Sequence, residues 1–392
     1  MGVLWALGGP DFRRFLVRAA ASPAAGRGDA DASGGCSPRS RNSFSYAIIL
    51  LVARLTRRRL LSAVPALGLG ATALHGAVPH SHGSASAAAE HEGMAADGGG
   101  HGGFRGGQVD HRANGFDPHA LLRDFDGGKV SRLPNGRTLR EWTIAAAEQE
   151  IEVAPGVRFT AWSYNGRIPG PTLRATEGDR LRIRFVNGGR HPHTMHFHGI
   201  HPASMDGVAG LGAGNIAPGG ETVYEFDAAP YGLHLYHCHV RPLAEHIAKG
   251  LYGAFLVDPK DAREKADEMV MVMNGFDTNF DRANEIYAAN TIGFAYSERP
   301  IRVKKGELVR VYLVNVLEYD LINSFHLHGN FFEYFPTGTS KTPSEFTDTV
   351  MLCQGQRGIL EMRFSYTGKY MFHAHQSEFT ELGWLGFFEV VE

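Results

Sequence analysis

The stretch EGDRLRIRFVN at residues 177–187 is matched by KGELVRVYLVN at residues 305–315. Both copies begin with a glycine turn and continue with alternating polar and apolar residues, a pattern that predicts a half-buried β-strand. A His-x-His-Gly motif follows each copy, at residues 196–199 and 326–329. The chain therefore contains an internal repeat, with units of about 120 residues.

The repeat units have the features of β-sandwiches. Each ends in an apolar strand, GAFLV at residues 253–257 or GFFEV at residues 386–390. Units of this length exceed the repeats of solenoid proteins, and their many glycine and proline turns suit a sandwich of two sheets. We therefore predict an all-β protein with two tandem β-sandwich domains, at residues 135–259 and 266–392, joined by a charged linker.

The N-terminal region carries an export pattern. The sequence TRRRLL at residues 56–61 resembles a twin-arginine motif, and the apolar run at residues 60–74 is too short to span a bilayer comfortably. We predict that residues 1–75 form an export signal, that translation begins near Val52, and that the mature protein is extracellular or periplasmic. A signal anchor is the alternative interpretation.

A low-complexity segment rich in His, Gly and Ala separates the export signal from the repeat. Residues 75–118 contain few large apolar side chains, so they cannot bury enough surface to offset the entropy of folding. We predict a low-complexity tail over residues 76–134 and expect the stretch up to residue 118 to be flexible.

Charge and cysteine content exclude some functions and favour others. The 39 Lys and Arg nearly balance the 41 Asp and Glu, whereas a nucleic-acid-binding protein would show a basic excess. Of the three cysteines, Cys36 lies in the predicted export signal. Cys238 is better explained as a metal ligand than as a disulfide partner. Cys353 follows an apolar run and is predicted to be an inert buried thiol.

Four His-x-His pairs are the strongest functional signal. In a strand, residues i and i+2 point to the same face, so each pair aims two imidazoles at one point. A lone pair is more often part of a surface strand, but four pairs in one chain indicate a metal cluster. Cys238 lies between two of the histidines and aims its sulfur the opposite way. The pairs are His196 and His198, His237 and His239, His326 and His328, and His373 and His375.

A second metal site is predicted around Cys238. A blue-copper centre needs one thiolate, two imidazoles and a weak axial group. Cys238 supplies the sulfur, His246 follows eight residues later, and His193 precedes the first pair. Leu251 takes the axial position, and because it cannot ligate, the reduction potential should be high. Alignment of the second repeat places non-ligating residues at the three ligand positions: Asn323, Ala374 and Phe379.

These motifs resemble the multicopper oxidases, specifically the bacterial two-domain, laccase-like members with blue copper in the first domain. The resemblance covers residues 135–392 and includes NGRIPGP at residues 165–171 and ELGW at residues 381–384. It implies two cupredoxin-like Greek-key domains. It also implies that His196 and His326 bind type 2 copper. The implied ligands of the type 3 pair are His198, His237, His239, His328, His373 and His375.

The resemblance further implies a reaction and an assembly. A small reducing substrate, such as a phenol or a metal ion, gives electrons to the blue copper. They pass through Cys238 to a trinuclear cluster that reduces O2 to water, so each chain holds four coppers. In the family this cluster lies between neighbouring subunits of a homotrimer. Asp206 and Glu378 are candidate acids near the cluster, although an aspartate before glycine is more often a turn residue.

Two other functions stay open. The first is a copper nitrite reductase, whose single catalytic copper would use His198, His237 and His375, but this leaves the other paired imidazoles without a role. The second is a non-catalytic periplasmic copper-binding or electron-carrier protein, which needs only the blue-copper residues. The electron donor cannot be read from the sequence.

Overall fold

The computed structural model describes residues 108–392, which belong to one compact unit. The predicted export signal and the tail up to residue 107 lie outside the described residues. Within residues 108–392, no helix is long and apolar enough to cross a membrane.

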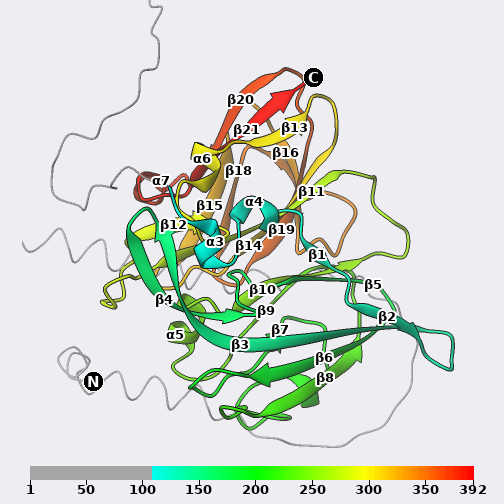
Figure 1. Ribbon diagram of the computed structural model, residues 1–392. Helices are drawn as coiled ribbons and strands as arrows, with labels where there is room; N and C mark the ends of the chain where they lie inside the picture. Colours follow the sequence, from blue (N-terminus) through cyan, green and yellow to red (C-terminus); the bar gives the residue numbers. More distant parts are fainter. Residues whose placement is uncertain (1–107) are drawn as a thin grey trace, which may run out of the picture. The chain divides into compact units, whose positions relative to one another are not determined.

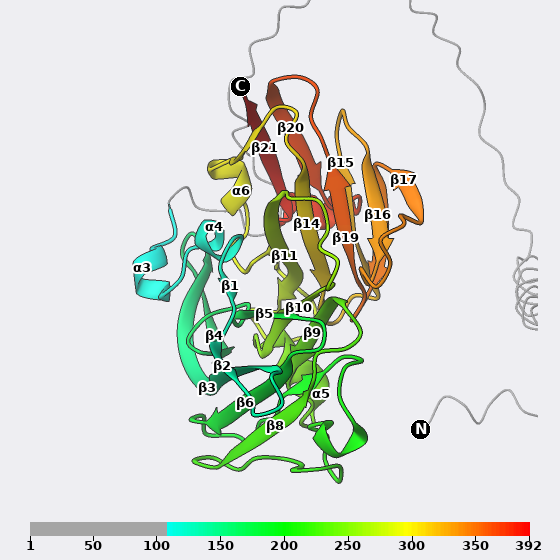
Figure 2. The same cartoon turned by 90° about the vertical axis from the view of Figure 1, so that its right-hand side faces the viewer.

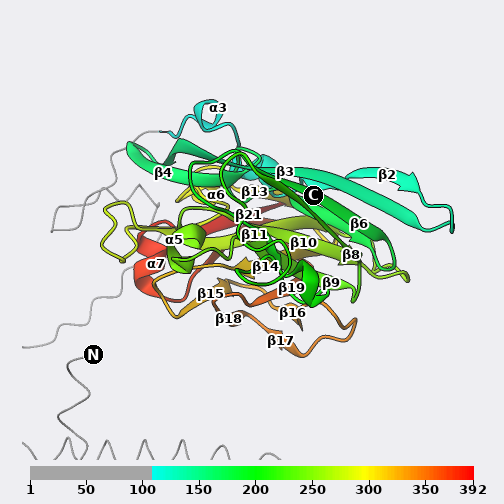
Figure 3. The ribbon, with the colours of Figure 1, turned by 90° about the horizontal axis from the view of Figure 1, so that it is seen from below.

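Two sheets form the first sandwich, drawn mainly in cyan and green in Figure 1. One sheet has the order β1-β5-β10-β9-β7, with bounds Phe125–Asp126, Thr172–Thr176, Tyr252–Asp258, Gly232–His237 and His196–Phe197. The other has the order β2-β3-β6-β8, with bounds Lys129–Arg132, Thr138–Ala154, Arg180–Asn187 and Glu221–Asp227. Strand β4 (Val157–Tyr164) pairs with β3 in this second sheet, and β3, β6 and β8 run side by side in Figure 3.

The second sandwich contains the later strands, and Figure 2 shows its two layers. One sheet has the order β12-β11-β14-β19-β16-β17, with bounds Ile286–Ala289, Asp267–Phe276, Val309–Asn315, Arg357–Met362, Phe332–Pro336 and Glu345–Thr347. The other has the order β13-β21-β20-β15-β18, with bounds Ile301–Lys304, Leu385–Val391, Gly368–His373, Ile322–Leu327 and Thr349–Cys353. The predicted cupredoxin-like fold with two sandwiches is therefore confirmed.

Short helices connect the strands. Their bounds are α3 His111–Asn114, α4 Pro118–Leu121, η1 Ala203–Met205, α5 Leu243–Ala248, α6 Ala295–Glu298 and α7 Ser377–Glu381. Helices α5 and α7 occupy matching places, because each follows the second His-x-His pair of its repeat and precedes the closing strand. The two helices therefore allow the repeats to be compared at the level of single residues.

The matched stretches form strands β6 and β14, as predicted, but they differ in burial. Residues of β6 alternate between buried and more exposed, as expected for a half-buried strand. All residues of β14 are buried. Tyr312 and Val314 of β14 belong to the same apolar core as Leu233 and Leu235 of β9. The outer face of β14 thus packs against the first sandwich, and this contact cannot be read from the local pattern.

Polar contacts also join the two sandwiches. Arg357 Nε donates to the carbonyl of Leu233 at 2.8 Å, and Thr291 Oγ1 donates to the carbonyl of Ile168 at 2.6 Å. The Leu233 backbone N–H donates to the carbonyl of Thr337 at 2.7 Å. Because these bonds accompany a shared apolar core, they fix one sandwich against the other.

Part of the predicted tail is folded, which corrects that interpretation for the described residues. Val109 and Phe116 pack into the core shared by the two sandwiches, and Leu122 is fully buried in the core of the second. The Val270 backbone N–H also donates to the carbonyl of Leu122 at 2.9 Å. A few well-spaced apolar residues therefore anchor a segment whose average composition predicts disorder.

Cys353 also differs from its prediction, because its thiol is exposed rather than buried. It is the last residue of the edge strand β18, and burial along that strand alternates, so Leu352 is buried and Cys353 is exposed. The apolar run before Cys353 suggested that the thiol is buried, whereas only one face of the strand is covered.

Candidate metal centres

The three predicted blue-copper ligands meet at one buried point. Cys238 Sγ lies 3.2 Å from His246 Nδ1 and 3.9 Å from His193 Nδ1, and the two Nδ1 atoms are 3.3 Å apart. His246 is carried by α5, Cys238 directly follows β9, and His193 precedes β7. All three side chains are buried, so the fold brings one sulfur and two nitrogen donors together away from solvent.

The surroundings of Cys238 orient its sulfur. The Thr194 backbone N–H donates to Sγ at 3.4 Å, and the Cys238 N–H donates to the carbonyl of Leu251 at 2.9 Å. Leu251 is fully buried in the same apolar core as Cys238. Its axial position beside the metal stays a prediction.

Trp162 covers the two imidazoles of this site. Its ring centroid lies 5.1 Å from that of His193 and 4.8 Å from that of His246, both in edge-on contacts. The indole is itself almost fully buried. It therefore forms a wall of the site, which the spacing of the ligands did not reveal.

The corresponding place in the second repeat lacks these donors. Asn323 and Ala374 are fully buried, and Phe379 on α7 stacks on Tyr287 with ring centroids 3.9 Å apart. An aromatic pair thus fills the space where α5 of the first repeat places an imidazole.

Burial sets the protonation of the blue-copper ligands. It lowers the pKa of His193 to about 3 and that of His246 to about 4, so both imidazoles are neutral and keep a lone pair for a metal. Burial raises the pKa of the Cys238 thiol, and a metal cation would offset this by stabilising the thiolate. A thiolate with two imidazoles is the donor set of copper electron-transfer sites, so these residues fit copper.

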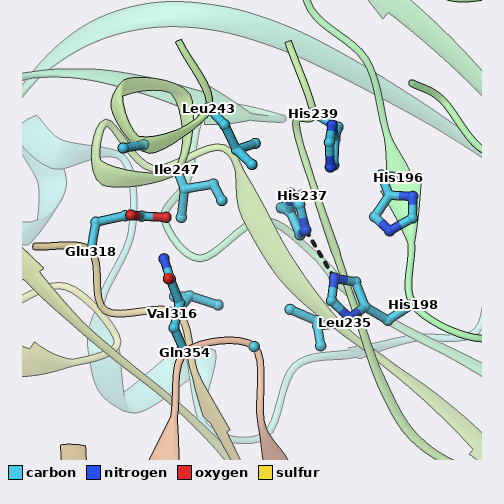
Figure 4. A pocket seen from close by; sticks show the side chains of 12 residues that line it. His196, His198, Leu235, His237, His239, Leu243, Ile247, Val316, Glu318 and Gln354 are labelled. Carbon is cyan, nitrogen blue, oxygen red and sulfur yellow. Dashed lines mark hydrogen bonds between the residues drawn. The ribbon is translucent and has the colours of Figure 1, made fainter. Parts of the chain in front are cut away.

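Four histidines of the first sandwich form a second cluster, shown in Figure 4. His198 Nε2 and His237 Nε2 are 2.9 Å apart. The ring centroid of His196 lies 5.0 Å from that of His198, 5.3 Å from that of His237 and 5.2 Å from that of His239. Burial lowers the pKa of His198 to about 3 and that of His237 to about 4, which leaves both neutral.

The second sandwich repeats this cluster. His328 Nε2 and His373 Nε2 are also 2.9 Å apart. The ring centroid of His326 lies 4.9 Å from that of His328 and 5.3 Å from those of His373 and His375. His328 and His375 are exposed, whereas no histidine of the first cluster is. The second cluster thus lies at the surface of the chain.

Backbone carbonyls orient four of these imidazoles. A carbonyl oxygen only accepts, so a ring Nδ1 bonded to it must carry the proton, and Nε2 then keeps the lone pair that a metal needs. The bonds run from His196 to Asp206 at 2.9 Å, from His237 to Cys238 at 2.8 Å, from His326 to Asp348 at 3.1 Å and from His373 to Ala374 at 2.5 Å.

The two clusters are separate in the part of the chain that the structure describes. Each contributes its own group of three converging imidazoles. No hydrogen bond or ring contact there joins a histidine of one cluster to a histidine of the other. Each cluster is therefore half of a larger set of ligands, if the eight histidines act together.

Of the two predicted acids, only Asp206 contacts a histidine of these clusters. Asp206 Oδ1 lies 3.1 Å from His196 Nδ1 and 3.4 Å from His201 Nε2. Glu378 is exposed on α7, and no side-chain hydrogen bond joins it to a described histidine. His201 thus shares the carboxylate of Asp206 with His196. The roles of both acids stay predictions.

A third acid was missed. Glu318, just after β14, lines the cavity onto which the first histidine cluster opens, and Figure 4 shows it across from the imidazoles. Burial raises its pKa to about 7. No sequence motif marks this residue, because its environment comes from segments far apart in the chain.

Comparison with known proteins agrees with this chemistry. Residues 145–262 and residues 265–392 each match a family described as multicopper oxidase. A solved multicopper oxidase structure shares 63% identity with a TM-score of 0.71, covering 72% of this chain and all of that one. Over its described part, the chain is thus similar in sequence and in fold to an enzyme of this family.

Copper nitrite reductases are also similar to this chain. The Neisseria meningitidis (serogroup A) enzyme is 28% identical over 252 residues, covering 59% of this chain and 64% of that protein. The Nitrosomonas europaea structure is 26% identical with a TM-score of 0.60, covering 65% and 94%. The chain spans just under two thirds of the curated relatives that it first matches. With both sandwiches matched, the chain belongs to the multicopper oxidase family.

Proposed function

We propose that this protein oxidises a small reducing substrate at a blue copper and reduces O2 to water at a trinuclear copper cluster. The observation that carries the proposal is the pair of matching four-histidine clusters beside a separate buried site of one cysteine and two histidines. An electron carrier needs only the buried site, so the eight further imidazoles favour an enzyme.

The residues divide naturally among four coppers per chain. His193, Cys238 and His246 would hold the blue copper, and Leu251 would be its axial neighbour. Type 2 copper would bind His196 and His326. Type 3 copper would bind the remaining members of the clusters, namely His198, His237, His239, His328, His373 and His375. Bound copper supplies one-electron chemistry at the first site and oxygen reduction at the cluster.

The chain itself supplies an electron path between the two sites. Cys238 lies between His237 and His239 in the sequence, so its backbone links a blue-copper ligand to two cluster ligands through a few covalent bonds. Its thiol is fully buried and accepts a hydrogen bond from the Thr194 N–H at 3.4 Å. The fold therefore fixes the positions of the groups at both ends of the path, namely the Cys238 thiol and the imidazoles of His237 and His239.

We propose a homotrimer in which each cluster forms between subunits. The support is that the two half-clusters are separate within one chain, and that the second is exposed. Large apolar side chains are exposed nearby: Leu321 precedes β15 and Ile322 begins it, and Met351 lies on the partner strand β18. A head-to-tail contact of this kind closes into a ring when the rotation is right.

Copper nitrite reduction is the second candidate, supported by the similar enzymes above. His198, His237 and His375 are present for a single catalytic copper. Five further imidazoles would then have no ligand role, although each of them contacts another imidazole: His196, His239, His326, His328 and His373. Because a single catalytic copper leaves these imidazoles without a role, oxygen reduction at a copper cluster is the better proposal.

Oxygen uptake by the copper-loaded protein tests this choice. We expect donor-dependent oxygen consumption, with four coppers per chain by metal analysis. Nitrite should neither replace O2 as the electron acceptor nor yield nitric oxide. Two coppers per chain together with nitrite-dependent donor oxidation would establish the nitrite reductase alternative.

Export is proposed on the sequence pattern alone, through the twin-arginine motif at residues 56–61. Expression of the full gene should place the mature protein outside the cytoplasm, and N-terminal sequencing should show cleavage after the apolar run. Retention in the cytoplasm would overturn this proposal.

A further inference from the structure

Glu318 occupies a cavity that no metal ligand of the second sandwich enters. The cavity has a volume of about 450 Å³ and lies against the first histidine cluster. Val316, Glu318 and Gln354 come from the second sandwich and face His196, His198, His237 and His239 across it, as Figure 4 shows. The cavity thus connects a carboxyl group with the imidazoles of the first cluster.

The backbone holds Glu318 in place. Its carbonyl accepts a hydrogen bond from Asn284 Nδ2 at 2.8 Å. Gly355 lies against the cluster, since a Cβ atom there would be 3.6 Å from His198 Cε1. Its neighbour Gln354 lines the same cavity as Glu318. The loop between β18 and β19 therefore spans from the carboxyl group to the imidazoles.

No lysine or arginine lines the cavity to hold Glu318 as an anion. Helix α5 contributes the apolar Leu243, Ala244 and Ile247, and the loop after β18 contributes Gln354 and Gly355. The titratable groups that line it are Glu318 itself and the four imidazoles, His196, His198, His237 and His239. On its own segment, Tyr319 follows directly, and Asp320 instead accepts hydrogen bonds from Asn284 and Tyr287.

This environment keeps a proton on the carboxyl group near neutral pH. Burial raises the pKa of Glu318 from its ordinary 4.5 to about 7, and the nearby side-chain amide of Gln354 opposes this shift. The group can thus give up and regain a proton in the pH range in which a general acid works best.

We propose that Glu318 is a catalytic residue that delivers protons to the oxygen being reduced at the His196, His198, His237 and His239 cluster. The inference rests on the proposed oxygen reduction. Each O2 takes four electrons from the donor and four protons to give two waters. In each transfer the carboxyl O–H bond of Glu318 breaks, an O–H bond forms on the reduced oxygen, and the carboxylate regains a proton from solvent.

Glu318→Gln tests this role, because it keeps the shape of the side chain and removes the acid. Glu333→Gln is the matched control, since Glu333 is exposed on β16, away from the cavity. Copper-loaded proteins are reduced by donor without oxygen and then mixed with O2 between about pH 5 and pH 9. Bleaching of the blue copper by donor should be equal in all proteins.

Reoxidation by O2 should separate the variants. Below pH 7 we expect Glu318→Gln to be slower than wild type by about tenfold or more, because general acid catalysis contributes factors of this size. The inflection near pH 7 should also disappear. Glu318→Asp keeps a carboxyl group and should therefore retain part of the wild-type rate. This variant also tests the role if Glu318→Gln folds poorly. In infrared difference spectra, a protonated carboxyl band that titrates near pH 7 in wild type should be missing from Glu318→Gln.

Two results would contradict the inference in distinguishable ways. If Glu318→Gln were reoxidised at the wild-type rate and with the same pH profile, the role of Glu318 alone would be overturned. A wild-type protein that takes up donor electrons but never passes them to O2 would overturn the proposed function, and the role of Glu318 with it.

Discussion

At the scale of single residues, Cys238 is the most informative, because it belongs to one site and its two neighbours belong to the other. Replacing it by serine puts a hard oxygen where copper needs a soft thiolate. We expect Cys238→Ser to lose the intense visible absorption and donor oxidation, while keeping the copper of the histidine cluster. Absorption spectra and metal analysis measure both effects.

The exposed Cys353 provides the control for this substitution. Cys353→Ser should keep the colour and the activity, because its sulfur lies on an edge strand and outside every described group of metal-ligating side chains. If Cys238→Ser retained its visible band, the assignment of this residue would be wrong.

Leu251 tests the axial position of the blue copper. Methionine has nearly the same volume, so Leu251→Met should cost less than about 1.5 kcal/mol of unfolding free energy. A thioether donates weakly to Cu(II), so the reduction potential should fall. Redox titration measures the change, and a potential that stays the same or rises would show that another residue is axial.

The convergence of the candidate metal ligands could be predicted, because it follows from the local spacing of the histidines. A His-x-His pair at a strand end converges whatever surrounds it, and the pairs do converge in both sandwiches. Glu318 could not be predicted, since its raised pKa depends on a cavity built from β9, α5 and the loop after β18. Trp162 was missed for the same reason, because its contacts with His193 and His246 are formed only by the fold.

At the scale of elements, the edge strand β18 connects the second histidine cluster to the surface. It pairs with β15, and its Met351 is 65% exposed. If this strand contacts a neighbouring subunit, Met351→Lys places an unpaired charge in that contact. We expect loss of the trimer and of oxygen reduction, with little change in the stability of the subunit, because exposed substitutions usually alter it by under about 0.5 kcal/mol.

Val130→Lys is the control for this substitution, because Val130 is 56% exposed on β2 in the other sandwich. Mass measurement in solution and thermal unfolding of both variants separate assembly from folding. A trimer that survives Met351→Lys with full activity would exclude β18 from the contact.

The local sequence patterns predicted the positions of the strands better than they predicted which strand faces are buried. The alternation in residues 177–187 gave both the strand β6 and its buried face. The same alternation in residues 305–315 predicted the strand β14. It did not predict that the second face of β14 is also buried, because that face packs on the first sandwich. Contacts between elements far apart in the sequence decide such cases, as they also do for the folded segment around Phe116 and Leu122.

At the scale of the whole molecule, the separation of the two half-clusters predicts that activity depends on assembly. Two inactive variants test this, one with His196 and His198 changed to alanine and the other with His326 and His328 changed. In a mixed trimer, one contact pairs an intact first sandwich with an intact second sandwich, one pairs two damaged halves, and the third pairs a damaged half with an intact one. Co-expression should therefore restore part of the oxygen reduction, although neither variant works alone. If one chain built the whole cluster, every chain would stay damaged, so mixed trimers confirmed by mass that show no activity would exclude clusters between subunits.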